Sequence, residues 1–312
     1  MNNKTVDDIP GYENLYDLKE AYPYKSYGPL IINVCLTGMV PMQSDNPHVP
    51  VTAEEIIADA GKVIEAGASM LHVHAREKDG TPAWRPEIFA RIIEGIRDID
   101  PEVVIVATTS GRVFTDFEHR SAVLELDGKA RPDMASLTLG SLNFPTTASV
   151  NSPEVVQQLA KRMQERGILP ELEVFELGML NYAFYLQRKG LLGATCYVNF
   201  LLGSLGTTPA RVFDLCNLVR ELPQNWTWGG AGIGRYQLPI NMAAMIMGGN
   251  VRVGLEDNLF YDGEKTRPAT NPGLVQRLVR IAREMDRTIA KPQETRKRLN
   301  LSNTCDQTVT PS

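Results

Sequence analysis

The stretch that decides the fold runs from Leu30 to His74, with LIINVCL over 30–36, TAEEIIADAGKVIEA over 52–66 and MLHVH over 70–74. The first and last runs are short and rich in apolar and β-branched residues, which is typical of buried strands. The middle run repeats apolar residues at i, i+1, i+4, i+7 and i+8, which predicts an amphipathic helix. The stretch therefore predicts a strand, a helix and a second strand.

The same alternation continues along the chain. Further strands are predicted at 103–108, 134–139, 171–176, 196–201, 226–230 and 251–254, and further helices at 86–99, 117–126, 153–166, 180–189, 210–221, 236–247 and 273–285. Eight strands, each followed by a helix, favour a single (β/α)8 TIM barrel over an open doubly wound sheet. The pattern covers about 258 residues, close to the roughly 250 that are usual for this fold.

We therefore predict an N-terminal arm at 1–29, a catalytic barrel at 30–290 and a C-terminal tail at 291–312. Helix ends support the pattern. Thr52 and Glu55 have the spacing of a capping box, and Gly67 follows the first helix as a C-terminal cap.

Composition excludes several classes of protein. The 312 residues are 43% hydrophobic and 22% charged, with a net charge of −5, which is typical of a globular protein rather than a disordered or collagen-like chain. Without a dense basic segment, we expect no nucleic-acid partner. We expect no membrane span, because no apolar run reaches about 18 residues, and no secretory signal, because the N-terminus is polar and acidic. Four scattered cysteines favour reduced thiols and a cytoplasmic location.

Two histidines stand at the end of the second predicted strand. His72 and His74 are two residues apart, so their imidazoles project from the same face of the strand. In a TIM barrel the C-terminal ends of the strands hold the active site. Two imidazoles there supply two of the three protein ligands of an open catalytic metal site. The alternative is a pair of hydrogen-bonded histidines in a polar barrel interior.

Two adjacent carboxylates, Glu256 and Asp257, follow the eighth predicted strand. Acidic residues directly after an apolar strand are usually paired or ligate a metal. With the two histidines, Glu256 would make a His₂Glu set that leaves coordination positions free. Arg252 precedes Asp257 by five residues and could orient it as a base. A helix cap, or a salt bridge to Arg252, is the structural alternative.

Smaller polar groups follow other strands. The run TTSGR, from Thr108 to Arg112, offers hydroxyl and backbone donors to a carboxylate or phosphate, although it also suits a polar turn. Ser136 and Thr138 share one face of the fourth strand. Glu173 interrupts an apolar run in the fifth strand, which points it into the barrel mouth or at a partner.

A glycine-rich segment, GGAGIGR, follows the seventh predicted strand at 229–235. Its order is not that of a dinucleotide-binding fingerprint, so it is weak evidence for such a site. Loops after the seventh and eighth strands of a barrel commonly bind phosphate groups. Gly232, Gly234 and Arg235 are therefore candidates for holding a cofactor phosphate, with a tight turn as the alternative.

Together, these motifs resemble the β-keto acid cleavage enzymes. The resemblance is carried by LHVHARE at 71–77 with DGTP at 79–82, AGIGR at 231–235, MGG at 247–249 and VRVGLEDN at 251–258. It implies a zinc-dependent barrel enzyme that converts a β-keto acid and acetyl-CoA into acetoacetate and a new acyl-CoA. By matched position, it implies His72, His74 and Glu256 as zinc ligands, Asp257 as the base and Arg252 as its orienting partner.

The resemblance also implies roles in the substrate pocket. Thr108 and Gly111 match the loop that binds the substrate carboxylate, Ser136 matches a pocket hydroxyl, and Glu173 matches an active-site carboxylate. Family members that cleave 3-keto-5-aminohexanoate carry an acidic residue after strand one, where this chain has Val40. An apolar side chain cannot pair with a substrate ammonium, and burying that group unpaired is costly. We therefore expect a β-keto acid with an uncharged or apolar tail.

Two other functions are alternatives to a β-keto acid cleavage enzyme. A metal-dependent hydrolase of the amidohydrolase type also begins with a His-x-His pair, but it needs a carbamylated lysine or further histidines, and only His48 and His119 remain. A degenerate binding barrel would have no reason to keep the His72, His74 and Glu256 set. The family resemblance further points to a homotetramer.

Overall fold

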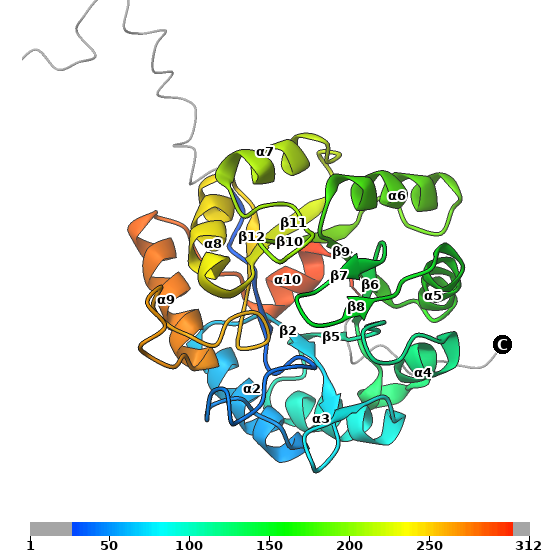
Figure 1. Cartoon of the computed structure of the whole chain (residues 1–312), viewed down its shortest axis with the longest axis horizontal. Coiled ribbons are helices and arrows are strands. Elements are labelled where there is room, and N and C mark those ends of the chain that lie inside the picture. Colours follow the sequence, from blue (N-terminus) through cyan, green and yellow to red (C-terminus); the bar gives the residue numbers. More distant parts are fainter. Residues whose placement is uncertain (1–26, 302–312) are drawn as a thin grey trace, which may run out of the picture.

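The computed structural model of the protein describes residues 27–301, which form a closed barrel of eight parallel strands (Figure 1). In chain order the barrel strands are β1 (Ile32–Cys35), β2 (Met70–Val73), β5 (Val104–Ala107), β6 (Met134–Thr138), β9 (Leu169–Val174), β10 (Tyr197–Leu202), β11 (Thr227–Gly232) and β12 (Asn250–Val253). Each strand pairs with its neighbours in this order, and β1 closes the barrel against β12. The predicted TIM barrel is confirmed.

Helices surround the barrel as an outer ring (Figure 1). They are α2 (Ala53–Ala66), α3 (Pro86–Ile99), α4 (Phe117–Ser121), α5 (Pro153–Glu165), α6 (Leu177–Arg188), α7 (Val212–Arg220), α8 (Gln237–Ile246) and α9 (Asn271–Glu284), with α10 (Pro292–Arg298) near the C-terminus. The helix predicted at 117–126 is shorter than expected, because α4 gives way to a 3₁₀ turn, η2 (Ala122–Glu125).

Two hairpins that the sequence analysis did not predict lie at the C-terminal ends of strands. One joins β3 (Ala75–Arg76) to β4 (Pro82–Ala83), and the other joins β7 (Leu142–Asn143) to β8 (Ala148–Ser149). Each has strands of only two residues, too short to show a period-two pattern. Of the predicted arm at 1–29, only 27–29 lie among the described residues.

The first helix shows how local sequence sets the element boundaries. The Thr52 side chain accepts a hydrogen bond from the Glu55 backbone at 3.2 Å, and the Glu55 carboxylate accepts one from the Thr52 backbone at 2.9 Å. This is the predicted capping box. Gly67 ends the helix at a φ of 119°, a left-handed conformation that glycine adopts without a steric penalty.

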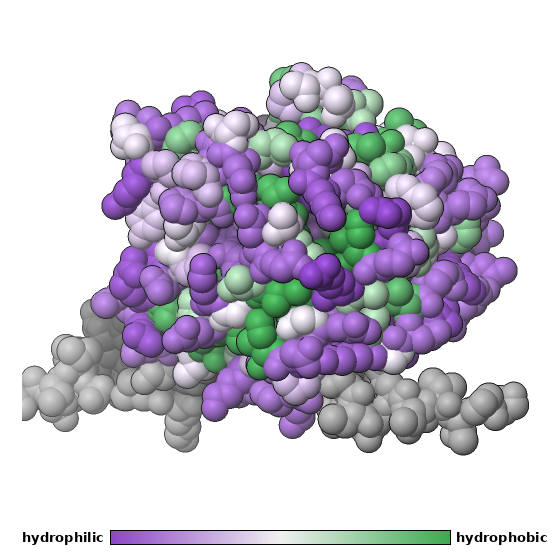
Figure 2. All heavy atoms as spheres, turned by 90° about the horizontal axis from the view of Figure 1, so that it is seen from below, coloured by the Kyte–Doolittle hydropathy of each residue, from purple (hydrophilic) through white to green (hydrophobic). Residues whose placement is uncertain are grey.

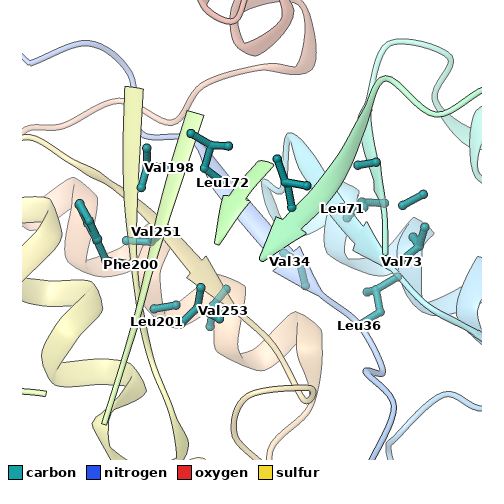
Figure 3. Close-up of a cluster of buried hydrophobic side chains, with 14 of the residues drawn as sticks. Val34, Leu36, Leu71, Val73, Leu172, Val198, Phe200, Leu201, Val251 and Val253 are labelled. Carbon is teal, nitrogen blue, oxygen red and sulfur yellow. The ribbon is translucent and has the colours of Figure 1, made fainter. Parts of the chain in front are cut away.

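Alternate residues of each strand pack outward against the helices, as a period of two requires. Val34, Leu71, Leu172, Val198 and Val251, on β1, β2, β9, β10 and β12, are fully buried in this layer, and Figure 3 labels them. Burying such a side chain contributes roughly 1.5–3 kcal/mol. This layer is the main hydrophobic core.

The inward-facing residues change in character along the barrel axis. Near the N-terminal ends of the strands they are apolar or aromatic, and include Met70, Met134 and Tyr197. Two positions further along the same strands, the inward residues are His72, Ser136 and Asn199. The strands therefore carry buried polar side chains toward their C-terminal ends, where a TIM barrel places its active site.

Helix α10 covers the N-terminal end of the barrel, and Figure 1 shows it inside the ring of outer helices. The Thr295 hydroxyl donates to Ser69 Oγ at 2.8 Å, just before β2. Arg296 is 1% exposed and donates to Asp133, just before β6, at 2.8 Å. The tail predicted at 291–312 is corrected for the described residues 291–301, because α10 and its contacts complete the N-terminal end of the barrel.

The outer surface is mixed. On the side of the molecule in Figure 2, hydrophilic side chains cover most of the surface, and apolar side chains occupy smaller areas between them. Among residues 27–301, no helix combines the length and the hydropathy that a membrane crossing needs.

The Asp133 carboxylate should be a major source of stability. It is buried, and it accepts hydrogen bonds from Arg97 at 3.0 Å and from Arg296 at 2.8 Å. Asp133→Ala would leave two buried guanidinium groups without their shared anion. We expect the free energy of unfolding, measured by urea denaturation, to fall by about 3–5 kcal/mol.

The matched control is Asp98→Asn, because Asp98 pairs with Lys129 at the exposed surface. Exposed pairs contribute about 1 kcal/mol or less, so this variant should unfold close to the wild type. Equal stabilities for the two variants would contradict the role assigned to Asp133.

Candidate active site

Two histidines and a glutamate converge at the C-terminal end of the barrel. His72 Nε2 lies 3.3 Å from His74 Nε2, which lies 3.3 Å from Glu256 Oε1. One ligand atom from each residue falls within 4.8 Å of the others. Glu256 Oε2 is buried and has no hydrogen-bond partner among residues 27–301. Two imidazole nitrogens and an orphaned carboxylate oxygen are a donor set that fits a divalent metal ion such as zinc.

A sharp turn after β12 brings Glu256 to the histidines. Gly254 adopts a φ of 150°, and a Cβ at this position would lie 2.0 Å from the Cys35 carbonyl oxygen. Glu256 then donates its backbone N–H to that same oxygen at 3.3 Å. The turn needs glycine, and it places the carboxylate beside His72 of β2 and His74, which follows that strand.

The Arg252 side chain, 1% exposed, holds three carboxylates around one guanidinium. Its Nε donates to Asp257 at 3.0 Å, Nη2 to Glu256 at 2.9 Å and Nη1 to Glu173 at 3.1 Å. Asp257 Oδ2 also accepts from the Cys35 thiol at 3.2 Å. The predicted contact between Arg252 and Asp257 is present, and it belongs to a larger buried network.

The network sets the charge states of the site. Burial lowers the pKa of His74, which favours the neutral imidazole that a metal ion requires. Burial alone would raise the pKa of Glu256, but His74 and Arg252 outweigh it and hold that pKa well below its usual range. Burial raises the pKa of Glu173. The site therefore contains one carboxylate with a strongly lowered pKa, Glu256, and another, Glu173, that takes up a proton more readily.

A cavity of about 350 Å³ opens above these residues. His72, His74, Glu256, Asp257 and Arg252 line its floor. Its other walls are mainly apolar, with a few hydroxyl and cationic groups, and include Met39, Val40, Pro41, Leu142, Phe144, Phe175, Leu201, Ile233, Leu259, Phe260, Thr108, Ser110, Thr138, Arg112 and Lys265. An apolar cavity with polar groups at one end is typical of a small-molecule site.

Several residues predicted for the substrate pocket line this cavity. Thr108 and Glu173 face it, and Val40 is 51% exposed at its wall. Gly234 also lines it and donates its backbone N–H to the Asp257 carbonyl oxygen at 2.7 Å. Residues indicated by the family resemblance and by the glycine-rich segment thus lie around one cavity.

Gly111 and Ser136 do not line the cavity. A Cβ on Gly111 would lie 2.4 Å from the Val150 carbonyl oxygen, so this glycine allows close packing of the loop. Ser136 is 1% exposed, and its hydroxyl accepts the Thr109 N–H at 3.0 Å. It lies one inward position below Thr138, whose side chain does reach the cavity. The pocket position predicted for Ser136 is therefore corrected to Thr138.

Gly232 and Arg235 also lie outside the cavity lining. The predicted seventh strand ends at Gly230, but β11 continues to Gly232, which pairs with Leu202 of β10. A Cβ on Gly232 would lie 2.0 Å from the Tyr236 carbonyl oxygen. Arg235 stacks over the Tyr236 ring, 5.5 Å from its centroid. Gly232, predicted as part of a phosphate loop, thus serves the packing of β11 against the chain that follows.

Glu171 is a site residue that was not predicted. It is completely buried, and its Oε2 lies 2.6 Å from His72 Nδ1. The sequence does indicate this residue, because Glu171 and Glu173 have the same i, i+2 spacing as the two histidines and therefore share one face of their strand. Arg112 is another site residue that was not predicted. The Arg112 guanidinium lies 4.1 Å from the Phe144 ring centroid, over the β7–β8 hairpin that was not predicted.

Fold and site together define a (β/α)8 enzyme with a candidate metal group beside a carboxylate held by a buried guanidinium. This arrangement suits acid–base chemistry on a carbonyl compound. The family model described as beta-keto acid cleavage enzyme matches residues 29–301, and the chain belongs to that family. The protein is accordingly a carbon–carbon cleaving acyltransferase.

Curated relatives carry names of this class. A 3-keto-5-aminohexanoate cleavage enzyme of Fusobacterium nucleatum is 40% identical over 274 residues, covering 87% of this chain and 98% of the relative. A 3-oxoadipate:acetyl-CoA acetyltransferase of Cupriavidus necator is 38% identical, covering 88% of this chain and 95% of the relative. The expected resemblance is confirmed, and relatives of similar identity differ in the keto acid that they are named for.

A solved structure titled as the ternary complex of ObcA with C4-CoA adduct and oxalate shares the fold. It matches with a TM-score of 0.74 and 19% identity, covering 82% of this chain and 68% of that one. At this identity the likeness concerns the barrel alone.

The amidohydrolase alternative is not favoured. Within residues 27–301, no candidate metal group includes a third histidine. Neither His48 nor His119 lines the cavity, and His119 instead contacts Asp116 at 2.6 Å.

The packing role of Gly232 can be tested directly. In Gly232→Ala the new methyl group would meet backbone atoms that cannot move independently. We expect the free energy of unfolding to fall by about 1–3 kcal/mol in urea denaturation.

Gly263→Ala is the matched control, because a Cβ there meets no heavy atom within 4 Å. Its stability should stay within about 0.5 kcal/mol of the wild type. A Gly232→Ala variant as stable as this control would contradict the packing role.

Proposed function

We propose that the protein is a zinc-dependent enzyme that converts a β-keto acid and acetyl-CoA into acetoacetate and a new acyl-CoA. One observation carries the proposal: the His72, His74 and Glu256 group and the Asp257–Arg252 pair share the floor of one cavity in a chain of this family. His72, His74 and Glu256 would hold the zinc. Bound zinc would supply Lewis acidity toward the keto group, which acidifies the neighbouring C–H bonds.

Asp257 is the base in this proposal. Arg252 holds its carboxylate from one side and the Cys35 thiol donates to it, so it faces the cavity with a fixed orientation. Asp257 removes a proton from C2 of the keto acid. The resulting carbanion attacks the acetyl thioester, a C–C bond forms, and the C–S bond breaks to release CoA thiolate.

The thiolate then attacks the original keto carbon, C3. The C2–C3 bond breaks, which leaves the acyl group on CoA, and C2 takes a proton back to give acetoacetate. For binding, we propose that Thr108 and Ser110 hydroxyls with the Arg112 guanidinium hold the acid's carboxylate, because all three line one wall of the cavity. The backbone at Gly234, at the mouth, is the remaining candidate from the predicted loop for contact with CoA.

We further propose a homotetramer, as the resemblance suggests, and a cytoplasmic location, as the scattered cysteines suggest. Exposed apolar side chains support association with other chains, since Phe213 is 84%, Leu205 65% and Val212 55% exposed around the start of α7.

The metal and the cosubstrate are tested together. We expect purified wild type to carry zinc and to form acetoacetate from a β-keto acid only when acetyl-CoA is present. His72→Ala and Glu256→Gln should each lose most of the zinc, measured by metal analysis, and most of the activity.

His48→Ala is the control, because His48 lies outside the cavity and should keep both zinc and activity. Zinc retained in both ligand variants would refute the ligand assignment. Acetoacetate formed without acetyl-CoA would refute the transferase reaction.

Val40 generates a prediction about the substrate tail. We expect wild type to turn over β-keto acids with uncharged tails better than 3-keto-5-aminohexanoate. Val40→Glu should raise kcat/KM for the amino substrate, relative to Val40→Gln, by roughly tenfold or more, since a hydrogen bond to a charged group contributes about 1.5–3 kcal/mol. A wild type that prefers the amino substrate would refute this assignment.

A further inference from the structure

Glu171 lies one layer below the cavity and collects three side-chain donors. It is 0% exposed, on β9. Its Oε1 accepts from Asn33 Nδ2 at 2.7 Å and from Asn199 Nδ2 at 2.6 Å, and its Oε2 lies 2.6 Å from His72 Nδ1. The carboxylate therefore joins strands β1, β2, β9 and β10 without facing the cavity.

The orientation of the two amides is fixed by their surroundings. The Tyr197 hydroxyl donates to Asn199 Oδ1 at 3.3 Å, which leaves the Asn199 amino group for Glu171. Turning the Asn33 amide would place its oxygen against a carboxylate oxygen. Both amides thus act as donors, and Glu171 acts as an acceptor for every partner, a role that suits an ionised carboxylate.

This arrangement determines where His72 carries its proton. In a neutral imidazole one ring nitrogen donates and the other accepts. Because Nδ1 faces the Glu171 carboxylate, the proton resides on Nδ1. The lone pair is then on Nε2, which is the atom that faces His74 in the candidate metal group.

We propose that Glu171 is a positioning residue that fixes the tautomer and ring orientation of His72 and so sets the affinity of the site for a divalent cation. The cation part rests on the proposed function, in which His72 is a ligand. The tautomer part rests only on the contacts of Glu171. Partners of this kind typically change metal affinity 10–100-fold when they are mutated.

Glu171→Gln keeps the size of the side chain but adds an amino group among three donors. If the new amino group takes the place of Oε2, it donates to His72 Nδ1. The imidazole proton then moves to Nε2, so Nε2 no longer has the lone pair that would bind a metal ion. Tyr197→Phe is the matched control, because it removes a hydroxyl from the same buried network without touching His72.

Zinc affinity is measured by competition with a chelator, on proteins shown to be folded by urea denaturation. We expect Glu171→Gln to bind zinc about 10–100-fold more weakly than wild type, and Tyr197→Phe to bind it within about twofold. Equal weakening in both variants would assign the effect to general disturbance of the barrel and overturn the proposal, as would wild-type affinity in Glu171→Gln.

The tautomer is measured independently by nitrogen NMR of histidine-labelled, metal-free protein in alkaline buffer, where imidazoles are neutral. The chain has only four histidines, and His72→Ala assigns the signal. We expect the His72 proton on Nδ1 in wild type, and at least partly on Nε2 in Glu171→Gln. A wild-type proton on Nε2 would overturn the proposal even if the variant did not fold.

These readouts separate the two proposals. A wild type that binds no zinc refutes the proposed metal site and the cation part of this inference, while the NMR result still decides the tautomer. A wild type that binds zinc through His72 but makes no acetoacetate refutes the proposed reaction and leaves the role of Glu171 standing.

Discussion

The buried Arg252 guanidinium is the interaction on which the site depends. Three carboxylates share it, although a fully desolvated charge is costly unless it is paired and hydrogen-bonded. One cation does not balance three anions, and Glu171 lies only 3.9 Å away. Burial raises the pKa of Glu173, and the nearby Glu171 carboxylate raises it further. The excess negative charge makes the floor of the cavity suited to an additional positive charge.

Strand alternation performs two tasks in this barrel. Outward residues such as Leu172 and Val198 build the core beneath the helices, and the inward residues between them form layers that become more polar toward the cavity. The packing of the lower layers therefore supports the reacting groups directly. His72 is held from below by Glu171, which is held by amides from two other strands.

The sequence predicted what depends on local spacing. His72 and His74 share a face because they are two residues apart, and Glu256 follows a strand that ends in a glycine turn. Depth within the barrel could not be predicted, because it depends on the stagger between strands, so spacing alone did not distinguish Ser136 from Thr138 on the same face of the strand. A glycine pattern likewise does not distinguish a phosphate loop from close packing, as at Gly232. The contact of Arg296 with Asp133, across 163 residues of chain, left no local signal.

Barrel closure and the site are physically connected. The pairing of Asn33 with Arg252 belongs to the seam where the first and last strands meet. On one side of this seam, β2 pairs with β1 and carries His72, with His74 just after it, and on the other side Glu256 follows β12. A ligand held by both sides binds only the closed barrel, so its binding free energy adds to the stability of the seam. Occupancy of the site and protection of the terminal strands from local unfolding are therefore thermodynamically coupled.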